Sequence, residues 1–295
     1  MTIDKYGRKW FKGNLHTHTT RSDGGKSPEE SAAIYRAAGY DFMSFTDHWI
    51  YGEGGYTDDG MLILSGCEYH LGTRPTPEDG IYHIIANGTA NEPEIDRVSA
   101  GVQDIIDGIA KVGGFIALAH PAWSLNRPEC FDRFTGIDAI EIFNSVSDLP
   151  RNCRPYSGAF ADTIAAAGHF PLLIAVDDTH FYNRDACRSY IMVNAEELTR
   201  ESILEALRSG RFYSTQGPEL FVTKREEDGC IVIETSDVST IIVYSDSVWV
   251  NERIWERGDK PLTGAIYKPV KSDSFVRVEA VDSEGRTAWS NFIRL

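Results

Sequence analysis

The sequence predicts an α/β protein with a mostly parallel sheet or barrel, followed by a small antiparallel β-sandwich. Three observations support this fold class. Apolar strand-like segments alternate with helix-like segments over the first two-thirds of the chain. Several helix-like segments carry capping residues or terminating glycines, and short strand-like segments separated by turns follow Gly217-Pro218. We expect a first domain over residues 1–214 and a β-sandwich domain over residues 215–295.

Four helices are expected from apolar periodicity and from the glycines that follow each segment. The first has the clearest start, because Ser27 can act as the N-cap, Pro28 suits the first turn and Glu30 can complete a capping box. The second is amphipathic and stops at Gly113-Gly114. In order, the helices are expected at residues 28–38, 99–112, 157–167 and 199–209.

The strands are predicted from short apolar runs bounded by turn residues. In the first domain they are expected at residues 10–16, 41–46, 62–66, 81–86, 115–119, 137–143 and 171–176. In the second domain they are expected at residues 221–223, 231–234, 241–244, 248–250 and 275–281.

Composition excludes some classes of function. The 295 residues carry a formal net charge of −15, which argues against binding to duplex nucleic acid through clustered cations. The five cysteines are odd in number and show no CxxC spacing, so we expect reduced thiols in a cytoplasmic protein. The first residues contain no apolar segment typical of a signal peptide, and no apolar run is long enough for a membrane span.

Imidazole and carboxylate side chains gather at the predicted strand ends. His16 and His18 are two residues apart and therefore share one face of an extended segment. Asp178 and His180 have the same spacing just after another strand. Because the carboxyl ends of parallel strands meet at one mouth of a barrel, ligands distant in sequence would converge there. These residue types are the ligands of divalent metals such as zinc. The pattern predicts a multinuclear metal site, to which Asp23, His48, Glu68, His83 and His120 would also contribute.

Each of these segments also has a purely structural interpretation when it is taken alone. His83 lies inside a strand and could be a core residue, and His120 before Pro121 could cap a strand. Asp47 could hold the tautomer of His48. Their combination in one chain, at predicted strand ends or inward faces, favours the metal site.

Further polar residues lie near these segments. His70 is expected at the rim, and His169 at a helix end, where a cation suits the helix dipole. Glu141 and Asn144 end a strand and could support the ligands, contact substrate or only mark the strand exit. Five cations in predicted loops could contact a phosphate, and we expect only one or two of them to do so: Arg21, Lys26, Arg74, Arg127 and Arg184.

Together these segments resemble the PHP (polymerase and histidinol phosphatase) family of metal-dependent phosphoesterases. The resemblance runs from about residue 11 to residue 180, with a continuation to residue 215. It implies a distorted (β/α)7 barrel that holds two or three divalent metal ions at the strand ends. The C-terminal segment is more distantly similar to that of a PHP subgroup that includes a carbamate-pesticide hydrolase. The matching segments contain His16-Thr17-His18, Ser22-Asp23-Gly24, Asp47-His48, Cys67-Glu68, His83, His120-Pro121 and Asp178-Thr179-His180.

The resemblance implies three groups of ligands, two of which share Glu68. They are His16, His18, Glu68 and Asp178 for one ion; Glu68, His83 and His120 for a second; and Asp23, His48 and His180 for a third. Asp178 is chosen because it keeps the Asp-x-His spacing, with Asp177 as the alternative. The residues expected to act directly in catalysis are Asp23, His48, Glu68 and His180.

The expected reaction is hydrolysis of a small phosphate monoester or a nucleotide by a metal-bridging hydroxide. Zinc, manganese and iron all accept this ligand set. The alternative is hydrolysis of a carbon-centred ester, amide or carbamate by the same metals, and a third reading is a non-catalytic binding module. The complete ligand set argues against the third reading. The expected partner is a small anionic phosphorylated substrate, without duplex nucleic acid or membrane, and the oligomeric state stays open.

Overall fold

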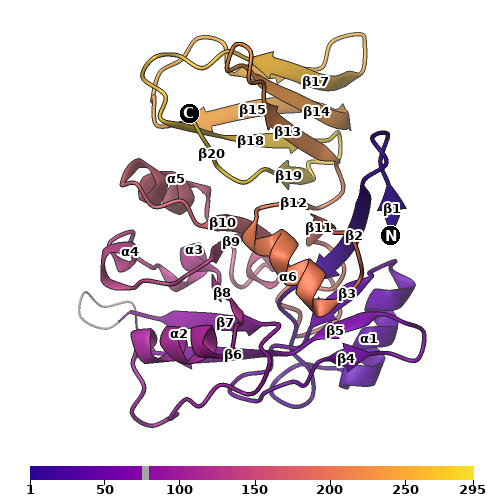
Figure 1. Cartoon of the computed structure of the whole chain (residues 1–295), viewed down its shortest axis with the longest axis vertical. Helices are drawn as coiled ribbons and strands as arrows, with labels where there is room; N and C mark the ends of the chain where they lie inside the picture. The colour runs from indigo at the N-terminus through magenta and orange to yellow at the C-terminus, as the bar shows by residue number, and fades with distance from the viewer. Residues whose placement is uncertain (75–79) are drawn as a thin grey trace.

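The computed structural model describes residues 1–74 and 80–295. Its strands form three sheets, with helices packed against the sheets of the first two-thirds of the chain (Figure 1). The alternation of strands and helices predicted for this part is therefore present. Within the described ranges, no helix combines the length and the apolar character that a bilayer crossing requires.

The largest sheet contains the strand that leads into the first histidine pair. Strands β2, β3 and β5 are parallel to one another, whereas β11 and β12 continue the sheet in antiparallel pairing on the other side of β2. Short β1 (Thr2–Ile3) pairs with β2 outside this row. In spatial order the strands are β12 (Phe212–Thr215), β11 (Tyr190–Asn194), β2 (Lys9–Asn14), β3 (Phe42–Ser44), β5 (Leu62–Leu64) and β4 (Gly55–Tyr56).

A second sheet of five strands supplies most of the remaining predicted ligands. Its strands β8, β9 and β10 are parallel, and β7 is antiparallel to both β6 and β8. In spatial order they are β10 (Leu172–Val176), β9 (Ala139–Asn144), β8 (Phe115–Leu118), β7 (Tyr82–Asn87) and β6 (Gly66–Leu71).

The two sheets do not close into the expected (β/α)7 barrel within the described residues. The reversed direction of β7 replaces parallel neighbours by antiparallel ones. Beyond the strand ends, the sheets touch through isolated bridges, such as Thr17 with Thr179 and His48 with Glu68. The mixed α/β class was predicted correctly, whereas the predicted (β/α)7 barrel is not found as a closed barrel in the described residues.

The helices form where capping residues and apolar periodicity predicted them. At α1, Ser27 accepts a hydrogen bond from the backbone N–H of Glu30, and the Glu30 side chain accepts from the N–H of Ser27, which completes the capping box. The four predicted helices are α1 (Pro28–Ala37), α2 (Val102–Lys111), α5 (Gly158–Ala166) and α6 (Arg200–Arg208). The short α3 (Pro121–Ser124), α4 (Cys130–Arg133) and the 3-10 turn η1 (Val146–Asp148) were not predicted.

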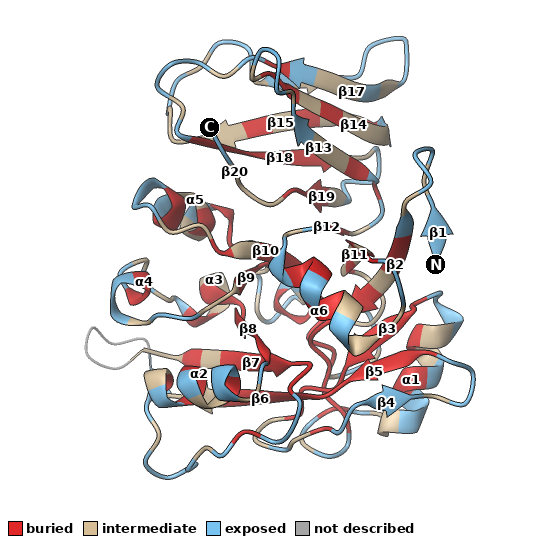
Figure 2. Ribbon diagram, in the orientation of Figure 1, coloured by how far each residue is buried: buried red, intermediate tan, exposed pale blue. Residues whose placement is uncertain are grey.

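Packing of these helices buries both faces of the strands (Figure 2). Ile203 and Leu207 of α6 join a core with residues of both sheets. Ile105 of α2 and Ile164 of α5 pack on the other face of the five-stranded sheet, and Tyr35 of α1 packs beside β3 and β5. Strands that are buried on both faces hold their ends in fixed positions, and the candidate site lies at these ends.

The C-terminal strands form two facing layers around an apolar core, as predicted for a β-sandwich. Ile231 and Ile233 of one layer pack with Ile241, Val243 and Val278 of the other. One layer is β13 (Leu220–Lys224), β14 (Ile231–Val238) and β17 (Leu262–Tyr267), and the other is β16 (Ile254–Glu256), β15 (Thr240–Ser245), β18 (Phe275–Val281), β19 (Thr287–Trp289) and β20 (Ile293–Arg294).

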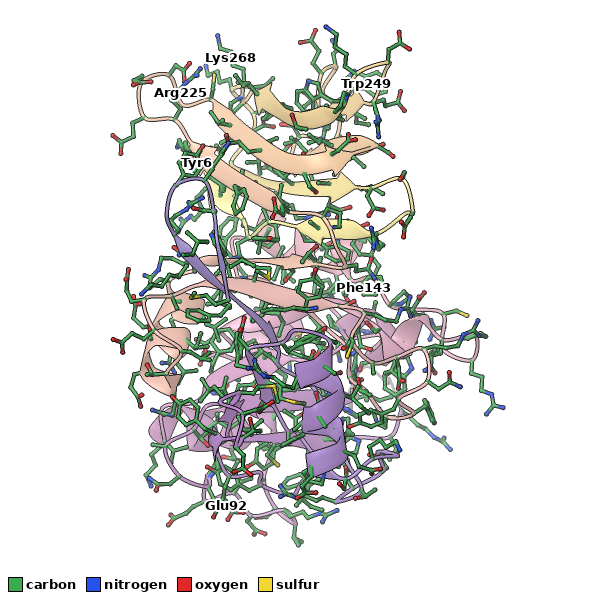
Figure 3. All side chains as sticks on the ribbon, turned by 90° about the vertical axis from the view of Figure 1, so that its right-hand side faces the viewer. Tyr6, Glu92, Phe143, Arg225, Trp249 and Lys268 are labelled. Atoms are coloured by element: carbon green, nitrogen blue, oxygen red, sulfur yellow. The ribbon has the colours of Figure 1, made fainter. Side chains whose placement is uncertain are left out.

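One predicted strand of this region is wrong. Residues 248–250 form no strand, and the side chains of Val248 and Trp249 are 99% and 87% exposed at a loop between β15 and β16. Figure 3 shows Trp249 at the end of the molecule formed by the C-terminal strands. Apolar character alone suggested a strand here, but Val248 and Trp249 are exposed, whereas Val250 packs against the C-terminal core without forming a strand.

The C-terminal layer is continuous with the largest sheet of the first two-thirds of the chain. Ser214 and Thr215 of β12 pair with Trp289 and Ala288 of β19. Arg277 of β18 is buried and bonds to Asp162 of α5 at 2.6 and 2.7 Å. The predicted boundary at residue 215 thus falls at the last residue of a strand that both parts share.

Candidate metal centre

The predicted ligands lie at one edge of the two sheets. His16 and His18 follow β2, His48 follows β3, His120 follows β8, and Asp178 with His180 follows β10. His83 is near the start of β7, and Glu68 lies within β6. Because β7 is antiparallel, its first residues reach the edge where the parallel strands end, and the backbone N–H of Ala119 donates to the carbonyl of His83. This reversal explains how His83 reaches the cluster although it lies inside a strand.

The six predicted histidine ligands converge around two buried carboxylates, Glu68 and Asp178, and Asp23 lies beside three of these histidines. The Nε2 atoms of His16 and His18 lie 3.0 and 3.1 Å from Oδ1 of Asp178. Glu68 Oε2 is 3.1 Å from Nε2 of His18 and 3.0 Å from Nδ1 of His48. Glu68 Oε1 contacts Nδ1 of His83 at 2.7 Å and lies 3.6 Å from Nε2 of His120. Glu68 therefore occupies the central position expected of a shared ligand.

Three groups within this cluster have ligand atoms close enough to hold a metal ion. They are His16 with His18 and Asp178; His48 with Glu68 and His83; and His18 with Asp23, His48 and His180. The last group matches the expected third set, with His18 added. In the second group His48 takes the place expected for His120, which lies between Glu68 and Asp178, 3.9 Å from Oδ2 of the latter.

Side chains behind the ligands fix their orientation. Nδ1–H of His16 donates to Oε1 of Glu141 at 2.6 Å, and Oε2 of Glu141 accepts the backbone N–H of His120 at 2.7 Å. Nδ1 of His120 lies 3.0 Å from the Ser124 hydroxyl, and Nδ1–H of His180 donates to the carbonyl of Asp178 at 2.8 Å. A proton on Nδ1 of His16 and of His180 leaves Nε2 of each ring as the atom that could bind a metal ion.

Glu141 and Asn144 are buried supports of the ligands. Nδ2 of Asn144 donates to Glu141 at 2.8 Å and to Oδ2 of Asp178 at 3.0 Å. Asn144 is fully buried and bonds to Asp178. The structure therefore does not place it where it could contact substrate, which was one of its expected roles. Ser124, missed from the sequence, is four residues after His120 in α3, a helical spacing that could have identified it.

The two adjacent aspartates have different positions. Asp178 points into the cluster, whereas Asp177 accepts hydrogen bonds from the hydroxyls of Tyr35 and Ser145 and from three backbone N–H groups of residues 187–189. Burial raises the pKa of Asp177 to about 6. Asp178 was thus the better choice of ligand, and Asp177 anchors the loop that follows the cluster.

Two ligand residues have unusual backbone conformations. Asp178 has φ of 53° and His120 has φ of 30°, both in the left-handed region. Non-glycine residues pay free energy for this conformation, and such strain concentrates at functional sites. Here the left-handed turn directs each side chain back over the strand end.

Electrostatics within the cluster favour positive charge between the carboxylates. Burial opposes a charge on His16, but the carboxylates of Asp178, Glu141 and Glu68 raise its pKa well above the usual range. For His18, burial is likewise outweighed by Asp178 and Glu68, which raise its pKa to about 9. Although burial opposes ionisation, the surrounding imidazoles keep the pKa values of Glu68 and Asp178 well below their ordinary range.

The residues fit a group of divalent cations. Glu68 Oε2 and Asp178 Oδ1 are buried atoms without a hydrogen-bond partner, although buried carboxylate oxygens are normally satisfied. The Nε2 atoms of His16 and His18 are only 3.1 Å apart, and two ring nitrogens facing one another at this distance suit shared coordination. Several histidine and carboxylate groups of this site could therefore bind metal ions.

Two neighbours of His48 differ from the sequence expectation. Asp47 does not hold its imidazole; it accepts from Thr19 and Ser22 and thereby fixes the loop after His18. His70 reaches further inward than a rim residue, with its Nδ1 3.1 Å from Nδ1 of His48. His169 lies elsewhere, half-buried and 3.0 Å from Asp132.

A cavity of about 240 Å³ opens over the cluster. Its other walls are Trp123, Val146, Ser147, Asn152 and Phe181. No lysine or arginine lines it within residues 1–74 and 80–295, so the predicted phosphate contacts are not found there. Arg21, Arg74 and Arg127 are exposed, Lys26 pairs with Glu30 at 3.2 Å, and Arg184 lines a neighbouring hollow.

Comparison with solved structures identifies the architecture. A two-domain protein from Bacteroides vulgatus that contains a predicted PHP-like metal-dependent phosphoesterase superposes with a TM-score of 0.55 at 15% sequence identity. The match covers 100% of this chain and 97% of that protein. The chain has a PHP-like fold.

The match extends over the whole chain, so it covers the C-terminal strands as well as the PHP-like part. An amidohydrolase from Chromobacterium violaceum matches 59% of the chain and 89% of its own length, with 15% identity and a TM-score of 0.41. A protein from Bifidobacterium adolescentis assigned as a metal-dependent phosphoesterase matches 57% of the chain and 87% of its own length, with 15% identity and a TM-score of 0.42. No family model and no curated protein matches the sequence.

Proposed function

We propose that this protein is a metal-dependent hydrolase that cleaves a small phosphate monoester or a nucleotide. The observation that carries the proposal is the convergence of His, Asp and Glu side chains around two buried carboxylate oxygens that no other group satisfies. A non-catalytic binding module would not need this complete and costly arrangement of buried charges.

The proposed reaction adds water across a phosphoester bond. The water oxygen bonds to phosphorus, the ester P–O bond breaks, and the leaving alcohol takes up a proton. Two or three divalent ions of zinc, manganese or iron, held by the nine ligands, would supply Lewis acidity and lower the pKa of water in the site.

The residues of the chain contribute by orienting these ligands. Glu141 and the carbonyl of Asp178 keep a proton on Nδ1 of His16 and His180, which leaves Nε2 of both rings free. Asn144 donates a hydrogen bond to Oδ2 of Asp178, so that Oδ1 of the same carboxylate faces His16 and His18. Such fixed ligand geometry lowers the cost of reorganisation during the reaction. Asp23, with its side chain about half exposed, and His48 and His180 border the cavity and are proposed to face substrate.

The test is a substrate panel on purified protein reconstituted separately with Zn²⁺, Mn²⁺ or Fe²⁺. Phosphate release from monoesters or nucleotides supports the proposal. A Glu68→Gln variant should lose activity and bound metal together, because Glu68 contacts the most ligands. A matched Glu205→Gln variant changes an exposed glutamate of α6 and should retain both. Full phosphate release by Glu68→Gln would contradict the proposed site.

The absence of arginine and lysine from the described cavity walls favours one alternative. A site without cations can accept an uncharged carbon-centred ester, amide or carbamate as readily as a phosphate dianion. Aryl acetates and carbamates therefore belong in the same panel. Cleavage of these compounds without phosphate release would replace the phosphoesterase proposal with a carbon-centred hydrolase that uses the same ligands.

A further inference from the structure

Apart from the predicted ligands, the cavity is lined by apolar and aromatic side chains together with Ser147 and Asn152. Trp123 and Phe181 lie over different parts of the ligand cluster. The indole of Trp123 packs edge-on against the His120 ring, with centroids 4.9 Å apart and an interplanar angle of 77°. The Phe181 ring lies 6.1 Å from the His180 ring. The two aromatic side chains therefore border the cavity from two separate strand ends, those of β8 and β10.

The orientation of Trp123 is fixed by hydrogen bonds. Its indole Nε1–H donates to Oδ1 of Asn152 at 3.3 Å, and Nδ2 of Asn152 donates to the carbonyl of Val146 at 3.1 Å. Both Asn152 and Val146 also line the cavity. The indole of Trp123 is thus held in place at the cavity wall. Phe181, in contrast, is 65% exposed and can adjust to a bound group.

The charges around the cavity restrict the leaving group. All described cavity walls lack lysine and arginine, and the bound metal ions would neutralise only the group that reacts. A second anionic group on the substrate would find carboxylates nearby and no cation in the same cavity. Arg184 and Arg188 line a separate hollow, where Arg188 is paired with Asp148 at 2.9 Å.

We infer that the preferred substrates are monoesters whose leaving group is an uncharged planar ring, held between Trp123 and Phe181. This inference rests on the proposed phosphoester hydrolysis and names the substrate class for it. An offset or edge-to-face ring contact contributes about 0.5–1.5 kcal/mol beyond buried area, which corresponds to roughly a two- to tenfold preference.

The test compares substrates of matched reactivity. Benzyl phosphate and cyclohexylmethyl phosphate have similar size and similar alcohol leaving groups, but only the first is planar. We expect kcat/KM to favour benzyl phosphate roughly two- to tenfold. The preference should disappear in Trp123→Leu, whereas Trp249→Leu, which changes an exposed tryptophan of the C-terminal strands, should keep it. Because the ratio is measured within one variant, partial loss of folded Trp123→Leu protein does not alter it, and Phe181→Leu provides a second variant.

Binding separates failure of this inference from failure of the proposed function. Benzylphosphonate and cyclohexylmethylphosphonate cannot be hydrolysed, and calorimetry on metal-loaded protein should show tighter binding of the first. If no phosphate ester is cleaved but benzylphosphonate still binds better through Trp123, the ring site stands and the phosphoesterase proposal falls. Equal kcat/KM and equal binding of the two members of each pair would overturn the inference. So would a preference for 4-carboxybenzyl phosphate that is lost in Arg184→Gln, because it would place a charged leaving group in the neighbouring hollow.

Discussion

Glu141 holds His16 through a 2.6 Å contact between Oε1 and Nδ1, and both side chains are completely buried. The same carboxylate accepts hydrogen bonds from the backbone of His120 and from Asn144. A single acceptor residue of β9 thus determines which nitrogen of His16 faces the proposed metals. The sequence left the role of Glu141 open, and the structure makes it the first residue to test.

Replacing Glu141 by glutamine should weaken metal binding about 10- to 100-fold, the usual effect of losing the residue that orients a ligand. Glutamine has one oxygen in place of two, and its NH2 group would face either His16 or the N–H of His120. Metal affinity can be measured by competition with a chromophoric chelator. Glu205→Gln, in an exposed ion pair with Arg211, is the control. Unchanged affinity in Glu141→Gln would show that His16 does not depend on this carboxylate.

Metal removal should lower thermal stability. Ions that bind only the folded protein add about 2.7 kcal/mol at a concentration one hundred times Kd. Dialysis against a chelator should therefore reduce Tm by several degrees, and return of Zn²⁺ or Mn²⁺ should restore it. Calorimetric scans of wild type and Glu68→Gln give the comparison. A metal-dependent Tm shift of equal size in the variant would argue that the ions bind elsewhere.

Without metal, stability should decrease as the solution becomes alkaline. The pKa of His18 rises from an ordinary value of 6.5 to about 9 in the folded chain. A raised histidine pKa stabilises the fold fully below pH 6.5, and this contribution is lost as pH rises through about 9. Its size is roughly 3 kcal/mol. Urea unfolding of chelated protein between pH 6 and 9.5 tests this, with His18→Gln expected to give a flatter profile. Stability that rises over this range in wild type would contradict the charge assignment.

His70 should influence metal binding through His48. If His70 accepts the Nδ1–H of His48 across 3.1 Å, Nε2 of His48 is left free to face Asp23. The variant His70→Ala should therefore bind fewer ions, with the loss in the candidate groups that contain His48. Metal content by mass spectrometry is the readout. His169→Ala, which removes a half-buried histidine beside Asp132 away from the cluster, should bind as many ions as wild type, and equal stoichiometry in both variants would dismiss the proposed contact.

The buried Arg277 should be important for stability. It bonds to Asp162 and Glu279 and contacts the hydroxyl of Tyr156. Arg277→Ala leaves the buried Glu279 without its charged partner, and breaking a buried ion pair in this way typically costs about 3–5 kcal/mol. The control Arg257→Ala breaks an exposed pair with Asp237 and should cost less than about 1 kcal/mol. Denaturant unfolding measures both, and equal small effects would mean that solvent reaches the Arg277 site.

Sequence analysis predicted which side chains gather in the cluster better than it predicted the strand arrangement around them. Spacing alone paired His16 with His18 and Asp178 with His180, because side chains two residues apart in extended backbone share a face. The reversal of β7 leaves no comparable signal: the run around His83 is equally apolar in either direction. Long-range pairing decides whether neighbouring strands are parallel, and the sequence pattern does not reveal it. A barrel was therefore expected, whereas the structure has two sheets that meet at isolated bridges.

The substrate side of the cavity was the least predictable part. The cavity wall is formed by Trp123 of the four-residue helix α3 and by Asn152 and Phe181 of loops. In such short segments no periodicity distinguishes a residue that lines a cavity from an ordinary surface residue. The cations chosen from the sequence were chosen for their charge alone, and charge does not reveal the direction of a loop side chain. Ser124 was within reach of helical spacing, but the four-residue helix that contains it was too short to be recognised.

The pairing of β12 with β19 has a consequence for engineering this protein. A truncated chain that stops at residue 214 would present an unprotected strand edge along Ser214, and such edges recruit other chains into aggregates. The C-terminal strands are therefore not a detachable module that could be exchanged at a flexible tether. Grafting them onto a different catalytic scaffold would require transplanting the docking strand as well.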